Sequence, residues 1–125
     1  MTPVPDLRDA VQAGVTLFNR RRYFEAHEHW ERCWGESAGD ARPFLEGLVQ
    51  LATGLHLRTR RGGTRGAEHL LARCLVTLDD YRPHAHGIDV ERLVTDVGTY
   101  LDWLREVQRP HRLLDVRRLP RIHGV

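Results

Sequence analysis

The sequence contains no lysine, and all of its 19 basic residues are arginines. They are almost balanced by 17 acidic residues, so that the formal net charge is only +2. So small an excess of positive charge argues against a dedicated nucleic-acid-binding protein, because such proteins carry a strongly basic surface. We attribute the use of arginine in place of lysine to genomic base composition rather than to function.

Long apolar runs and cysteines are scarce as well. No stretch approaches the roughly 20 apolar residues that a membrane-spanning helix needs, and the N-terminus lacks the basic and apolar stretches of a secretion signal. The only cysteines, Cys33 and Cys74, show no motif spacing, which argues against a disulfide framework and a zinc knuckle. We therefore expect a cytoplasmic protein without a membrane partner, in which both cysteines are reduced and packed.

The length and the composition favour a single globular domain. A chain of 125 residues can form a real core, and 41% hydrophobic against 29% charged residues is ordinary for such a domain. Apolar residues recur at helical spacing, whereas no alternation is long enough for a sheet. The sequence thus predicts an all-α fold, a compact bundle of about five helices with short loops. We place the helical domain at residues 1–108 and an arginine-rich C-terminal tail, docked or flexible, at 109–125.

Local signals indicate where several helices begin or end. Asp6, Thr64 and Asp89 each precede an apolar period and are expected N-caps. The stretch from Arg58 to Arg65 combines several arginines with a pair of glycines, and we interpret it as a basic loop.

The third helix, from about Pro43, is apolar over much of its circumference, as expected of a central helix. Gly47 and Gly54 lie on one flank of it, where the lack of a side chain would let another helix approach closely. Gln50 interrupts the apolar pattern. It is either a packed core amide at a second interface or part of a polar site.

The most informative stretch runs from Tyr23 to Trp34. On a helix, at about 100° per residue, it places several aromatic residues together with His27 and Glu31 on one side, which we expect to be buried. Ionisable groups in an apolar setting need polar partners. The pattern therefore predicts a semi-buried polar cluster, and its candidate residues are His27, Glu28, Glu31, Trp34, Gln50 and His56.

This stretch resembles the signature of domain-of-unknown-function family 309, a group of small bacterial and archaeal helical proteins. The family motif His-x-x-x-Glu-x-x-Trp is matched by His27, Glu31 and Trp34, and the resemblance extends over roughly Asp6 to Leu104. It implies a helical fold and a motif but no activity.

Three interpretations of the cluster remain open. His27 and Glu31, four residues apart, can reach one divalent metal ion, with further ligands from Glu28, Gln50, His56 or His69. Alternatively, the pair belongs to a hydrogen-bonded network that only fixes the helix register. In the third interpretation a carboxylate orients a histidine that acts as a general base. No nucleophile elbow or phosphate-binding loop points to a particular reaction.

We favour a small binding or interaction domain, with a metal-dependent or acid–base enzyme built on His27 and Glu31 as the alternative. The apolar residues of the tail indicate docking on its own domain or on a second subunit, so we expect a homodimer or a protein partner rather than nucleic acid. The exposure of His27 discriminates between the interpretations. An open cleft favours chemistry, and complete burial favours a structural role.

Overall fold

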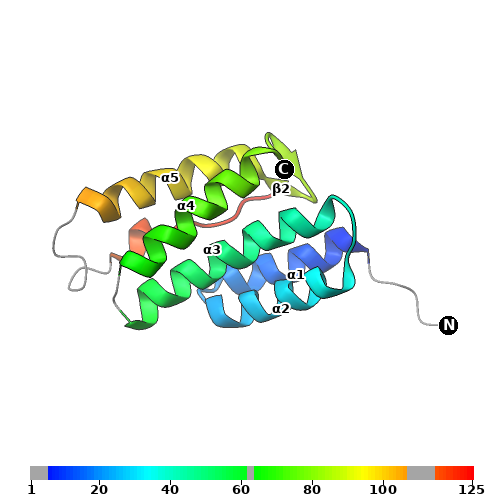
Figure 1. Ribbon diagram of the computed structural model, residues 1–125, viewed down its shortest axis with the longest axis horizontal. Helices are drawn as coiled ribbons and strands as arrows, with labels where there is room; N and C mark the ends of the chain where they lie inside the picture. Colours follow the sequence, from blue (N-terminus) through cyan, green and yellow to red (C-terminus); the bar gives the residue numbers. More distant parts are fainter. Residues whose placement is uncertain (1–5, 62–63, 107–114) are drawn as a thin grey trace.

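The structure, a computed structural model, describes residues 6–61, 64–106 and 115–125. Its helices are α1 (Leu7–Asn19), α2 (Tyr23–Glu36), α3 (Ala41–Arg61), α4 (Arg65–Asp79) and α5 (Val90–Glu106). Between α4 and α5 lie two short strands, β1 (His84–Ala85) and β2 (Ile88–Asp89), and a short 3₁₀ helix, η2 (Val116–Arg118), follows later. The predicted all-α bundle is confirmed (Figure 1).

The central position of α3 is also confirmed. It packs against α2 on one side and against α4 on the other, while α1 lies against α2 and α5 against α4 (Figure 1). Its fully buried apolar side chains are Phe44, Leu45, Leu48, Leu51, Ala52 and Leu55. Within the described residues, no helix is both long and apolar enough to cross a bilayer.

The two glycines of α3 allow the close approach of α4, as the sequence predicts. A Cβ atom on Gly47 would lie 2.8 Å from Leu78 Cδ2, and one on Gly54 would lie 3.3 Å from Leu70 Cβ. A methyl group at Gly47 would therefore require the buried Leu78 side chain to move, because real Cβ atoms do not approach other atoms this closely.

Two of the three expected N-caps form. The Asp6 carboxylate accepts a hydrogen bond from Arg8 N at 3.1 Å, and that of Asp89 accepts one from Arg92 N at 3.0 Å. Each of them satisfies a backbone N–H that has no partner within its helix. The side chain of Thr64 makes no such bond, so the prediction of that cap is wrong.

The prediction that a basic loop begins at Arg58 is wrong, because α3 continues to Arg61. Arg58 is 1% exposed and lies beside the Tyr100 hydroxyl of α5. Burial raises the pKa of Tyr100, and the Arg58 charge partly offsets this rise. An arginine in a basic stretch of sequence is usually solvated. Here a tertiary partner on a distant helix supports its burial.

The C-terminal segment, residues 115–125, packs on the helices and extends the β1–β2 hairpin. Asp89 N donates to His123 O at 2.8 Å, and Val125 N donates to Gly87 O at 3.3 Å. Leu119 and Ile122 are buried in the common core. This part of the tail is therefore docked, whereas residues 109–114 lie outside the described residues.

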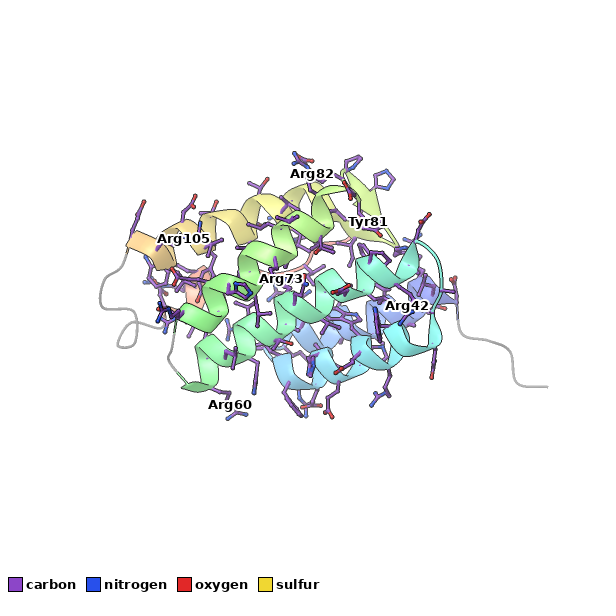
Figure 2. The ribbon with its side chains drawn as sticks, in the orientation of Figure 1. Arg42, Arg60, Arg73, Tyr81, Arg82 and Arg105 are labelled. Atoms are coloured by element: carbon purple, nitrogen blue, oxygen red, sulfur yellow. The ribbon has the colours of Figure 1, made fainter. Side chains whose placement is uncertain are left out.

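Arg82 joins the end of α4 to the start of α5 on the surface of the molecule (Figure 2). Its guanidinium donates to Asp79 Oδ1 at 2.8 Å and to both carboxylate oxygens of Glu91, at 2.7 and 2.8 Å. The hydrogen bonds from Arg82 are the main cause that lowers the pKa of Glu91.

We expect Arg82→Gln to lower the free energy of unfolding at neutral pH. Because the folded-state pKa of Glu91 is depressed, its contribution is present above the unfolded-state pKa and is lost as the pH falls through the folded-state pKa. Urea unfolding of both proteins across this acidic range should show the difference shrinking with falling pH. A difference that is independent of pH would contradict this role of the Arg82–Glu91 pair.

Candidate functional site

The buried face of α2 is a narrow stripe formed by Tyr23, Ala26 and Trp30. The rings of Tyr23 and Trp30 lie 5.1 and 6.0 Å from that of Phe18 on α1. Trp30 is fully buried, and its Nε1 donates to Val11 O at 3.1 Å. This stripe, rather than the residues around His27, attaches α2 to the bundle.

The neighbouring face of α2 is partly open to solvent. Phe24 is 49% and Trp34 is 37% exposed, and the side chains of His27 and Glu31 are 24% and 60% exposed. The expectation that these residues lie on the buried face is therefore wrong. The prediction gave most weight to the large aromatic residues. The stripe that is buried is completed instead by the small Ala26, between Tyr23 and Trp30.

His27 and Glu31 form the pair that their spacing predicts. Nε2 of His27 lies 2.9 Å from Oε2 of Glu31. A carboxylate only accepts hydrogen bonds, so Nε2 carries the proton and Nδ1 faces away from Glu31. His27 makes no other hydrogen bond within the described residues. It can therefore offer Nδ1 to a ligand.

Phe24 connects this pair to α3. Its ring centroid lies 5.8 Å from that of His27 and 5.3 Å from that of His56. The structure thus brings two of the candidate residues, His27 on α2 and His56 on α3, to the same aromatic ring. Phe24 was not among the predicted site residues, although its position three residues before His27 was a usable signal.

A hollow of about 370 Å³ lies beside Phe24, between the start of α2 and the end of α3, and we call it the α2–α3 hollow. Figure 1 shows these two helix ends at the same end of the bundle. The walls of the hollow include Phe24 and His56 together with Arg21, Arg22 and Arg60. Within the described residues, no side chain caps the N-terminus of α2, which leaves backbone N–H groups directed outward at this end.

The charges around the α2–α3 hollow are mostly positive. Arg22 Nε is paired with Glu25 Oε1 at 2.8 Å, whereas Arg21 and Arg60 have no carboxylate partner in the described part of the chain. Tyr23, another wall residue, adds no negative charge, and burial raises its pKa further, to about 12. An anion is therefore the ligand that this hollow favours.

Other candidate residues lie elsewhere. Gln50 faces α4, where its Oε1 accepts a hydrogen bond from Thr77 Oγ1 at 3.2 Å, so it belongs to a second interface and not to the cluster. The Trp34 ring lies under Arg42, with the guanidinium carbon 3.9 Å from the ring centroid. Glu28 and His69 are exposed, and neither makes a hydrogen bond or ion pair among the described residues.

A metal site is not assembled by the residues that the structure describes. Within them, no group of three or more histidine, cysteine, aspartate or glutamate side chains could hold a metal ion. His27 and Glu31 provide two ligands, and a stable protein site for a divalent metal uses at least three.

The cysteines do not provide a nucleophile either. Burial raises the pKa of both thiols, that of Cys74 to about 12. His29 lies 3.8 Å from Cys33 Sγ, but its Nε2 also lies 2.6 Å from Ala10 O. A nitrogen that donates to a carbonyl cannot accept the thiol proton.

We expect His27→Ala to lower the free energy of unfolding by about 1 kcal/mol or less, because the pair lies at the surface and its carboxylate is well solvated. Glu31→Gln keeps the size of the side chain and should have an effect of similar size. Chemical denaturation measures both. A loss of several kcal/mol would instead indicate a buried pair that cannot tolerate the removal of one partner.

Comparison with known proteins shows that the part of the chain that forms this hollow matches a protein family. Residues 11–70 match the family model described as Domain of unknown function (DUF309). The match runs from α1 into the first turns of α4 and includes both sides of the α2–α3 hollow. No curated protein gives a significant match to the sequence. Over residues 11–70, the chain is therefore similar to the DUF309 family, an all-helical domain whose function is unknown.

Proposed function

We propose that this domain binds a small organic acid in the α2–α3 hollow. The observation that carries the proposal is the half-exposed Phe24 ring, which contacts both His27 and His56 and forms a wall of the hollow. A volume of about 370 Å³ falls in the lower part of the range for small-molecule sites.

The charge and the apolar wall together define the ligand. Arg21, Arg60 and the uncapped N-terminus of α2 attract an acid group, and the exposed Phe24 ring offers an apolar surface. Arg60 extends from the last turns of α3 at the edge of the bundle (Figure 2). The fitting ligand has one or two carboxylates on an apolar or aromatic body.

Acid–base catalysis is the second candidate function. Glu31 holds the proton on Nε2 of His27, which leaves Nδ1 to accept a proton. His27 is 24% exposed, so a bound molecule can reach it. In this case the carboxylic acid is a substrate, and its proton or leaving group lies near His27.

Binding is tested by NMR spectroscopy of the histidine rings during titration with benzoate, succinate and acetate. We expect benzoate or succinate to shift the resonances of His56 and His27, and acetate to have less effect because it has no apolar body. Phe24→Ala and Arg60→Gln should each weaken binding. Arg73→Gln is the matched control, because Arg73 is exposed on α4 and does not line the hollow.

The proposal fails if none of these acids shifts the histidine resonances. It also fails if Phe24→Ala binds them as the wild-type protein does. Catalysis is separated from binding by His27→Gln, which should retain binding of the acid but lose any turnover that depends on a base at this position.

A further inference from the structure

The C-terminal segment forms a groove together with α5, on a part of the chain that the family match does not include. The groove has a volume of about 380 Å³. Arg92 and Trp103 of α5 lie on one wall, and Arg117, Arg118 and Arg121 of the C-terminal segment lie on the other. It shares no wall residue with the α2–α3 hollow.

The arginines of this groove outnumber their carboxylate partners. Arg92 Nε lies 3.7 Å from Asp96 Oδ2, and Arg117 and Arg118 share Asp115 at 3.3 and 3.5 Å. Arg121 has no carboxylate partner within the described residues. Four guanidinium groups therefore face two carboxylates, and the groove keeps a positive potential that an anion would neutralise.

The arginines are carried by backbone that is well fixed. Asn19 forms two hydrogen bonds, each of 2.8 Å, with the backbone of Ile122, and Asp89 N donates to His123 O. Leu119 and Ile122 are buried on either side of Arg121. A ligand that binds here would not have to order the segment first, and this lowers the entropic cost of binding.

Aromatic side chains form part of the same groove. The Arg118 guanidinium carbon lies 5.0 Å from the centroid of the Trp103 ring, which lies 5.8 Å from that of Tyr100. Stacking on the ring holds the guanidinium plane while its N–H groups remain able to donate. His123 also lines the groove, and its buried Nδ1 has no hydrogen-bond partner in the described part of the chain.

From this arrangement we infer that the groove between α5 and the C-terminal segment binds a phosphorylated small molecule that carries a ring. Guanidinium groups bind phosphate oxygens in bidentate fashion, and a doubly charged phosphate suits several arginines better than a single carboxylate does. Trp103 provides the aromatic surface for the ring. The volume of the groove suits one such molecule rather than a polymer.

Isothermal titration calorimetry with adenosine monophosphate, inorganic phosphate and adenosine tests this site. We expect adenosine monophosphate to bind, inorganic phosphate to bind more weakly and adenosine not to bind. Arg121→Gln and Arg117→Gln should each weaken the binding of adenosine monophosphate about tenfold. Both variants should fold, because Arg121 is exposed and the Arg117 side chain is 90% exposed.

Two further variants make the test specific. Trp103→Leu should weaken the binding of adenosine monophosphate but not that of inorganic phosphate, and equal losses would contradict a ring-binding role. Arg105→Gln is the matched control, since Arg105 is exposed on α5 outside the groove. Benzoate should not displace adenosine monophosphate, which separates this site from the α2–α3 hollow. The inference is overturned if neither phosphate compound binds, or if Arg121→Gln binds both as the wild-type protein does.

Discussion

Gly14→Ala is expected to lower the free energy of unfolding by about 2–3 kcal/mol, although alanine is the better helix former. A Cβ atom on Gly14 would overlap Nε1 and Cε2 of Trp30. Trp30 is fully buried, and its Nε1 is bound to Val11 O, so the ring has no free space into which to move. Relief requires α1 and α2 to separate or the indole hydrogen bond to break.

Gly98→Ala provides the matched control for this prediction. Gly98 lies within α5, and a Cβ atom there would have no other atom within 4 Å. We expect this variant to gain about 0.5–1 kcal/mol from helix propensity alone. Urea denaturation measures both variants. Equal stability of Gly14→Ala and the wild-type protein would mean that α1 and α2 do not pack at this distance.

Much of the fold could be predicted because helices leave a strong periodic signal. The apolar period and the caps at Asp6 and Asp89 located the helices, and Gly47 with Gly54 located the flank that α4 contacts. The hairpin could not be predicted in this way, because a two-residue strand is too short to show alternation. The burial of Arg58 depends on a helix that is distant in the sequence, so no local pattern encodes it.

The candidate site could be predicted only as far as one helix determines it. The spacing of His27 and Glu31 fixes their contact on any α-helix, and the structure contains it. The contact of Phe24 with His56 and the position of Gln50 both depend on how α3 is rotated relative to α2. That rotation is set by packing between helices, which a single sequence does not display.

Asn19→Ala is expected to release the C-terminal segment from the helices. Nδ2 of Asn19 donates to Ile122 O and its Oδ1 accepts from Ile122 N, both at 2.8 Å, so the side chain pairs with this residue as a neighbouring strand would. Removing both bonds leaves two backbone groups without partners, and we expect a loss of about 2–3 kcal/mol. Hydrogen exchange should show lost protection of the Ile122 amide.

Gln12→Ala is the matched control, because Gln12 also lies on α1 but its side chain makes a single hydrogen bond within the described residues, to His86 O at 3.2 Å. It should cost about 1 kcal/mol and leave the Ile122 amide protected. Unchanged protection of Ile122 in Asn19→Ala would show that burial of Leu119 and Ile122 alone holds the segment. Asn19 lies within the family match and Ile122 lies outside it. A released segment would therefore mean that a residue within the family match supports the groove between α5 and the C-terminal segment. In that case Asn19→Ala should also weaken the binding of adenosine monophosphate.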